Sequence, residues 1–117
     1  MSFAWDRPPR VIGHRGAPRE APENTLPSFR ACLRDGVRAV ELDARLSRDG
    51  RVVVHHDAAL GRVVPGDAFV AGTESEALRA LGIPLLEEVL ALDLLVNVEL
   101  KADAPNADEL PRRALDV

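Results

Sequence analysis

The fold of this chain is decided by residues 39–57, which read Ala-Val-Glu-Leu-Asp-Ala-Arg-Leu-Ser-Arg-Asp-Gly-Arg-Val-Val-Val-His-His-Asp. Val40–Leu46 alternates between apolar and charged side chains, which predicts a strand. Arg51–His56 carries three consecutive valines, a strong signal for a second strand. Asp49-Gly50 lies between the two runs and is a hairpin-turn signal. The stretch therefore predicts two strands joined by a short turn.

The direction of these strands follows from the length of the link. A connection of about five residues is too short for a crossover between parallel strands, so we expect an antiparallel pair. The alternation places Glu41, Asp43 and Arg45 on one face, and the apolar side chains largely on the other. Folding about the turn sets Asp43 roughly opposite His55-His56, which is a possible arrangement for a metal and a base.

The residues before this hairpin predict a βαβ unit. Val11-Ile12-Gly13 reads as a short strand, and Leu26, Phe29 and Leu33 recur at helical spacing. Asn24 is a good N-cap and Gly36 a C-cap signal for that helix. A strand, a helix and a strand in this order indicate an α/β fold with a parallel sheet.

The residues after the hairpin predict loop, helix, helix, strand and helix. Ala58–Thr73 is rich in Gly and reads as loop. A short helix through Leu81 follows, with Thr73 or Ser75 as its cap. A second helix starts at Pro84 and carries Leu86, Val89 and Leu90 on one face. The last two predicted elements are a strand over Leu94–Lys101 and a helix over Asp108–Leu115. The strand is almost wholly apolar until Glu99, so we expect it to be buried on both faces.

Composition sets limits on the class of protein. The 117 residues amount to one small domain at most, and 46% hydrophobic residues can form a buried core. A net charge of −4 without a basic cluster argues against a nucleic-acid partner. Cys32 is the only cysteine, which excludes a disulfide framework. Met1–Arg7 has no apolar signal-peptide core and no run is long enough to span a membrane, so we expect a cytoplasmic protein without stable membrane insertion.

Four polar clusters lie at or beside the ends of predicted strands, namely His14-Arg15, Glu41 with Asp43, His56-Asp57, and Glu99 with Lys101. In α/β folds, catalytic residues come from the carboxyl ends of several strands. The three carboxylates are hard oxygen donors suited to Mg²⁺ or Ca²⁺. The arginine and the lysine could hold a phosphate, and the histidines suit general acid–base roles.

Each cluster alone also has a plain structural explanation. Glu-Leu-Asp is usually a solvated face, His-Asp often only a turn, and Glu-Leu-Lys an ordinary surface pair. Asn24 is better explained as a helix cap than as a ligand, and Cys32 as helix packing. The occurrence of all four clusters in order at strand ends favours one divalent-metal phosphate site.

These motifs resemble those of the glycerophosphodiester phosphodiesterase family. The resemblance rests on His14-Arg15-Gly16, Pro22-Glu23-Asn24-Thr25, Glu41-Leu42-Asp43, Asp49-Gly50, His56-Asp57 and Glu99-Leu100-Lys101, and runs from about Val11 to Lys101. It implies a (β/α)8 TIM barrel. It also implies hydrolysis of glycerophosphodiesters to sn-glycerol 3-phosphate and an alcohol, in glycerophospholipid breakdown, with Mg²⁺ or Ca²⁺.

The resemblance also implies a role for each site residue. Glu41, Asp43 and Glu99 would be metal ligands, His14 and His56 the acid–base pair, and Arg15 and Lys101 the phosphate-binding residues. The metal would lower the pKa of the glycerol hydroxyl, which would attack phosphorus to give a cyclic phosphate that water opens. His55 matches no required position.

Length is the departure from the family. A barrel needs about 250 residues, whereas residues 1–117 would supply the N-terminal portion of one such domain, roughly three βα units and the hairpin. One hypothesis is an enzyme completed by a missing C-terminal half, acting on a small glycerophosphodiester. A second is a truncated, catalytically silent fragment that binds a metal or a partner, or self-associates. A related phospholipase D-like or phosphoinositide-cleaving activity is a further alternative.

Overall fold

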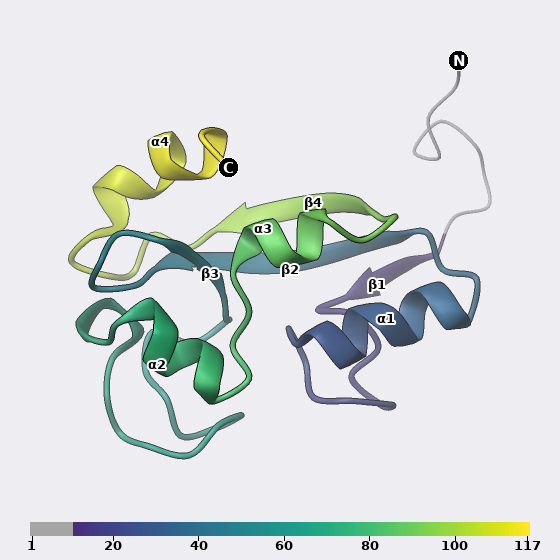
Figure 1. Cartoon of the computed structure of the whole chain (residues 1–117), viewed down its shortest axis with the longest axis horizontal. Helices are drawn as coiled ribbons and strands as arrows, with labels where there is room; N and C mark the ends of the chain where they lie inside the picture. Colours follow the sequence, from purple (N-terminus) through teal and green to yellow (C-terminus); the bar gives the residue numbers. More distant parts are fainter. Residues whose placement is uncertain (1–10) are drawn as a thin grey trace.

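A computed structural model describes residues 11–117 and has one long strand, β2 (Ala39–Leu46), at the centre of a four-stranded sheet (Figure 1). β1 (Ile12–His14) and β4 (Leu95–Leu100) both pair with β2 in parallel. β3 (Val52–Val54) pairs with it antiparallel. The predicted parallel sheet and the antiparallel hairpin are therefore both confirmed, while the prediction about Met1–Arg7 lies outside the described residues.

Strands β1 and β3 share one edge of β2, because β4 occupies the other edge from Ala39 to Ala44. β1 runs up this edge until His14 stands beside Glu41. β3 runs down the same edge, and the next residue, His55, donates its backbone N–H to the carbonyl of Asp43 at 2.9 Å. The carboxyl ends of two strands thus meet beside the middle of β2.

The predicted turn between β2 and β3 is confirmed and is closed by hydrogen bonds. The N–H of Ser47 donates to the carbonyl of Arg51 at 3.0 Å, and Gly50 has a φ of +81°. The hydroxyl of Ser47 donates to Asp49 at 2.6 Å. This closed turn fixes the register that sets Asp43 beside His55.

Helix α1 (Leu26–Arg34) connects β1 to β2 and packs on one face of the sheet, and its N-cap differs from the prediction. Thr25 is the N-cap residue, and its side chain accepts a hydrogen bond from the N–H of Ser28. Asn24 is therefore not the cap. At the other end, Gly36 has a φ of +81° and the N–H of Val37 donates to Cys32, which is a Schellman closure and confirms the predicted stop.

The second half of the chain contains the helices that the sequence predicts, with shifted ends. It comprises a 3₁₀ turn η2 (Val70–Gly72), α2 (Ser75–Ala80), α3 (Leu86–Leu90), a 3₁₀ turn η3 (Ala107–Glu109) and α4 (Leu110–Leu115). Neither Thr73 nor Ser75 caps α2, since the N-cap is Glu74 without a side-chain bond. The Thr73 hydroxyl bonds Phe69 instead.

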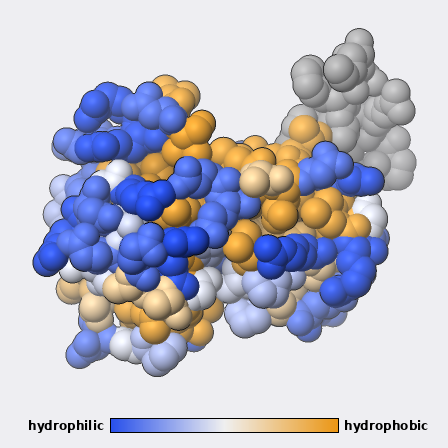
Figure 2. All heavy atoms as spheres, in the orientation of Figure 1, coloured by the Kyte–Doolittle hydropathy of each residue, from blue (hydrophilic) through white to orange (hydrophobic). Residues whose placement is uncertain are grey.

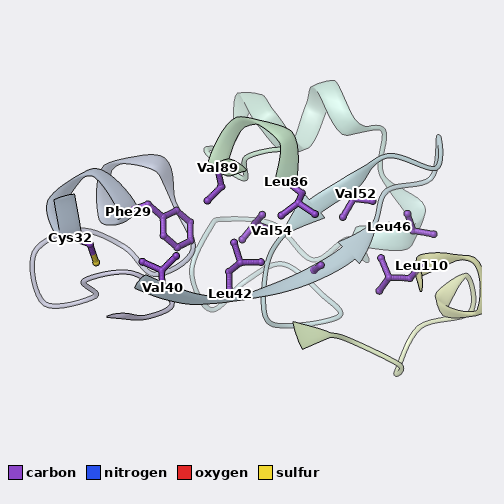
Figure 3. Close-up of a cluster of buried hydrophobic side chains, with 11 residues drawn as sticks. Phe29, Cys32, Val40, Leu42, Leu46, Val52, Val54, Leu86, Val89 and Leu110 are labelled. Atoms are coloured by element: carbon purple, nitrogen blue, oxygen red, sulfur yellow. The ribbon is translucent and has the colours of Figure 1, made fainter. Parts of the chain in front are cut away.

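The main core lies between one face of the sheet and the helices that cover it (Figure 3). It contains the apolar face of β2, valines of β3, and residues of α1, α3 and α4, namely Phe29, Cys32, Val40, Leu42, Ala44, Leu46, Val52, Val54, Leu86, Val89 and Leu110. The sequence predicts Leu90 on the same face as Leu86 and Val89, but Leu90 is exposed while the other two are buried. The opposite face of β2 is left for charged side chains.

β4 is not buried on both faces as predicted. Asn97, Glu99 and Leu100 are exposed and the other three residues are half-buried. Among residues 11–117, no strand pairs with the outer edge of β4. Apolar residues gather on the surface over β4 and α3 (Figure 2). The strand therefore has more apolar side chains than residues 11–117 bury.

The helices of residues 11–117 are short, and none has the length and apolar character that crossing a membrane requires.

Candidate active site

The polar face of β2 and the neighbouring ends of β1 and β4 bring three carboxylates together. Asp43 and Glu99 are register partners on adjacent parallel strands, and Glu41 lies two residues before Asp43 on the same face. One oxygen from each of the three lies within 4.8 Å of the others. The three acids that the sequence suggests as metal ligands therefore lie close together in the structure.

Two cations lie against these acids. The Nε of Arg15 is 3.3 Å from Asp43, and the Nζ of Lys101 is 3.6 Å from Asp43 and 2.8 Å from Glu99. Asp43 itself is only 1% exposed. The residues nominated for phosphate therefore lie beside the carboxylates, where they offset part of the negative charge.

The pKa values of the acids reflect this crowding. Burial and the neighbouring Asp43 carboxylate raise the pKa of Glu41, against the partial opposition of His14. A hydrogen bond with Asp43 and the Lys101 ammonium lower the pKa of Glu99 to about 2. An additional positive charge would relieve the repulsion between Glu41 and Asp43.

His14 and His56 approach the acids from the ends of β1 and β3. The Nε2 of His14 is 3.2 Å from Glu41, on a side chain that is largely exposed. The Nδ1 of His56 is 2.6 Å from Asp57. His14 thus lies against the acidic cluster, whereas the contact of His56 is with Asp57.

Local backbone geometry explains the His14-Arg15-Gly16 motif. Arg15 has a φ of +58° and Gly16 a φ of +91°, so the chain turns sharply at the end of β1. A Cβ on Gly16 would lie 2.3 Å from the Oγ of Ser28, which leaves room only for glycine. The turn lets the N–H of Arg15 donate to the carbonyl of Glu41 at 2.8 Å, and this holds the guanidinium beside β2.

Asn24 is a site residue that the sequence analysis assigned to a helix cap. It is 2% exposed, has a φ of +56°, and its Nδ2 donates to the Oδ2 of Asp43 at 3.0 Å. Asn tolerates the left-handed region better than most residues. The signal that favoured a cap, a short polar side chain before a helix, is equally a signal for a buried turn residue. The neighbouring Thr25 provides the cap.

Three buried oxygens at the site lack a hydrogen-bond partner among residues 11–117, namely Oδ1 of Asn24, Oε1 of Glu41 and Oδ1 of Asp43. Buried polar atoms are normally satisfied, so three unsatisfied acceptors in one place call for a donor or a cation. Carboxylate and amide oxygens suit Mg²⁺ and Ca²⁺. The donor set therefore fits a divalent cation, without distinguishing these two metals.

Arg45 supports the site from the same face of β2. It is buried, and its Nε and Nη2 donate to the carbonyl of His56 at 3.0 and 2.7 Å. Its Nη2 also pairs with Asp103 at 2.8 Å. The alternation of the strand placed Arg45 beside the acids, but only the structure shows that it fixes the backbone that carries His56.

His55 is buried beside the site, with 3% of its surface exposed. Burial lowers its pKa, which favours a neutral imidazole. Its backbone N–H donates to the carbonyl of Asp43 at 2.9 Å. The structure, like the sequence, gives its side chain no chemical role.

Comparison with known proteins gives a consistent picture. Residues 14–115 match the model of the glycerophosphoryl diester phosphodiesterase family. A glycerophosphodiester phosphodiesterase of Caldanaerobacter subterraneus is 36% identical over 109 residues, which cover 79% of this chain and 45% of that protein. The chain thus spans about half the length of the curated relatives it matches.

Solved structures agree with this match. A glycerophosphodiester phosphodiesterase from Thermotoga maritima has a TM-score of 0.75 and 35% identity, and covers 92% of this chain and 46% of its own. A phosphodiesterase from Oleispira antarctica, solved with the product sn-glycerol-3-phosphate, has a TM-score of 0.83 and 32% identity, and covers 97% and 53%.

Proposed function

The chain belongs to the glycerophosphoryl diester phosphodiesterase family, and on that premise we propose that the protein containing it hydrolyses glycerophosphodiesters to sn-glycerol 3-phosphate and an alcohol. Its fold is that of the (β/α)8 barrels of the family over about half their length, as the sequence predicted. We further propose that residues 1–117 form the N-terminal portion of a single domain of this kind. The substrate is a small molecule, and the alcohol is released.

The observation that carries this proposal is the group of three carboxylates, two of which have an unsatisfied buried oxygen, with His14 and two cations beside them. Glu41, Asp43 and Glu99 would hold a divalent cation, with Mg²⁺ and Ca²⁺ as the candidates. Such a cation, when bound, lowers the pKa of a coordinated hydroxyl and offsets charge on a phosphoryl oxygen.

Arg15 and Lys101 would bind the phosphodiester. Both side chains are partly exposed at the surface beside Asp43, so each can reach a ligand while it keeps its acidic partner. A guanidinium can contact two phosphate oxygens at once, whereas an ammonium acts as a point charge. Together they would orient the phosphorus towards the histidines.

His56 and His14 would divide the proton transfers. Because the Nδ1 of His56 faces the Asp57 carboxylate, that nitrogen holds the proton and Nε2 is free to accept one from the attacking glycerol hydroxyl. His14, whose Nε2 lies 3.2 Å from Glu41, would protonate the leaving alcohol. The P–O bond to the alcohol breaks as the cyclic phosphate forms, and water then opens the ring.

The test uses the complete protein and follows glycerophosphocholine by ³¹P NMR with Mg²⁺, with Ca²⁺ and with EDTA. The proposal predicts conversion to glycerol 3-phosphate that stops with EDTA and resumes when metal is restored. Asp43→Asn should abolish turnover, while Arg79→Ala on the remote helix α2 should not. If the protein instead releases only phosphatidic acid from a phospholipid, or only inositol phosphates from a phosphoinositide, it has one of the related activities.

A further inference from the structure

Arg62 joins two acidic residues beside the candidate site, Glu23 and Asp57. Its Nε donates to the Oδ2 of Asp57 at 2.8 Å and its Nη2 to Oδ1 at 3.2 Å. Its Nη1 and Nη2 donate to the two oxygens of Glu23 at 3.0 and 2.7 Å. One guanidinium therefore grips two carboxylates that are 34 residues apart in the sequence.

Each of these carboxylates is also bound to a proposed active-site residue. Asp57 accepts from the Nδ1 of His56 at 2.6 Å. Glu23 accepts from the Nη1 of Arg15 at 3.3 and 3.4 Å. Arg62 is thus the centre of a continuous chain of charged hydrogen bonds that runs from the phosphate-binding arginine to the acid–base histidine.

The loop that carries Arg62 is held in place by its own packing. Leu60, Val63 and Val64 join a second apolar cluster on the far side of β3. The N–H of Leu60 donates to Ala68 at 2.8 Å, and that of Gly61 donates to Val64 at 2.9 Å. Arg62 therefore projects towards the site from a braced loop.

We propose that Arg62 is a positioning residue that holds the Asp57 carboxylate against His56, and thereby keeps the imidazole in the tautomer with Nε2 free, while it braces Arg15 through Glu23. In a neutral histidine, the hydrogen bond at one ring nitrogen decides which nitrogen carries the proton. Arg62 does not itself contact the reacting atoms. The kinetic part of this proposal rests on the proposed function, whereas the tautomer part does not.

The charges around Asp57 support this role. The hydrogen bonds from Arg62 first, and from His56 second, hold the pKa of Asp57 well below its usual range. Arg62 likewise lowers the pKa of Glu23. Both acids therefore remain ionised acceptors across the working pH range. An ionised Asp57 can accept the Nδ1 proton but cannot donate to that nitrogen.

The experiment compares Arg62→Ala and Arg62→Lys with Arg79→Ala in the complete protein. Arg79 is a matched control, because it makes the same kind of double grip, on Glu76 and Glu88, away from the site. The His56 tautomer is read from ¹⁵N shifts of histidine-labelled protein, assigned with His56→Gln. The values of kcat and KM are measured on glycerophosphocholine, and thermal melting reports folding.

Arg62→Ala should shift the His56 ¹⁵N signals towards the other tautomer, and should lower kcat about 10- to 100-fold, as loss of a supporting contact typically does. KM should rise less than kcat falls, because Arg62 does not touch the phosphodiester and acts on Arg15 only through Glu23. Arg62→Lys keeps the positive charge, so its His56 ¹⁵N signals and its kcat should lie between those of wild type and Arg62→Ala. This variant also provides the test if Arg62→Ala does not fold. Arg79→Ala should change neither readout.

Unchanged His56 signals in both Arg62 variants would overturn the proposal, whether or not kcat falls. A tautomer shift in a protein whose wild type releases no glycerol 3-phosphate would uphold the positioning role and refute the proposed function instead. The two failures are therefore distinguishable.

Discussion

Replacement of Asn24 tests whether this buried amide positions Asp43 for a cation. Asn24→Gly removes the hydrogen bond to Asp43 but keeps the backbone free to adopt the φ of +56°. Asn24→Ala removes the same bond and adds a Cβ in the left-handed region. The pair of variants separates the role of the side chain from the strain of the backbone.

The magnitudes follow from the contacts of Asn24. A hydrogen bond to an ionised group contributes about 1.5–3 kcal/mol, and an unpartnered buried oxygen costs about 1–3 kcal/mol, so these two terms nearly cancel. The glycine variant should therefore lose mainly the about 0.5–1 kcal/mol that the unfolded-state entropy of glycine costs. A Cβ in the left-handed region costs about 1–2 kcal/mol, and the extra unfolded-state entropy of glycine offsets about 0.5–1 kcal/mol of the difference. Asn24→Ala should therefore unfold about 0–1.5 kcal/mol more easily than Asn24→Gly.

Metal affinity should fall in both variants alike. Loss of a group that orients a ligand typically costs 10- to 100-fold in affinity, or about 1.4–2.7 kcal/mol. The assays are urea unfolding in EDTA and calorimetric titration with Ca²⁺. Asn106→Ala is the matched control, since Asn106 also has an unpartnered Oδ1 but donates to the carbonyls of Leu46 and Ser47. Equal Ca²⁺ affinity in wild type and both Asn24 variants would refute the positioning argument.

Three further predictions concern catalysis, acid stability and association. His14→Ala and His56→Ala should each lower kcat at least about 100-fold, a typical general acid–base contribution, and wild-type turnover in both would remove them from the mechanism. Burial alone would raise the pKa of Asp49, but hydrogen bonds from Ser47 and Ser75 lower it to about 2. The ionised Asp49 carboxylate therefore stabilises the fold fully above its unfolded pKa of about 3.9, and this stabilisation disappears as the pH falls towards 2. Asp49→Asn should remove this pH dependence from the stability measured by urea unfolding. An unchanged pH profile would contradict the assignment. Residues 1–117 expressed alone should associate through the open edge of β4, and a monodisperse monomer with a cooperative melt in size exclusion and calorimetry would show that this edge is harmless.

The hairpin was predictable because its signals are local. The alternation of β2, the valines of β3 and the Asp49-Gly50 turn each specify a short piece of backbone, and together they fix the register that sets Asp43 beside His55. The three acids followed from the same logic, since residues two apart on a strand share a face. Their approach within 4.8 Å required only the parallel register of β4.

The role of Asn24 was not predictable, because the outcome depended on which of two adjacent residues caps α1. Asn24 and Thr25 are both good caps, and only the sharp turn through Arg15 and Gly16 draws the first of them towards β2. Arg62 gave no signal at all, since a single arginine in a glycine-rich loop is typical of exposed sequence. Its partners are brought together by tertiary structure alone.

The burial of β4 was predicted wrongly for a different reason. Its apolar sequence is that of a strand covered on both faces, but residues 11–117 supply a pairing partner on one edge only. The family match gives the physical context, because the relatives are about twice as long. The sequence of β4 therefore specifies surroundings that this length of chain does not contain.

Anomalous diffraction from crystals of the complete protein grown with Mn²⁺ tests the central claim most directly. The account predicts one strong peak between Glu41, Asp43 and Glu99, at about 2.0–2.6 Å from an oxygen of each. The peak should be absent from Asp43→Asn crystals grown in the same way. A peak bound elsewhere, or no peak in wild-type crystals that hold ample Mn²⁺, would contradict the assignment of these three carboxylates as the metal site.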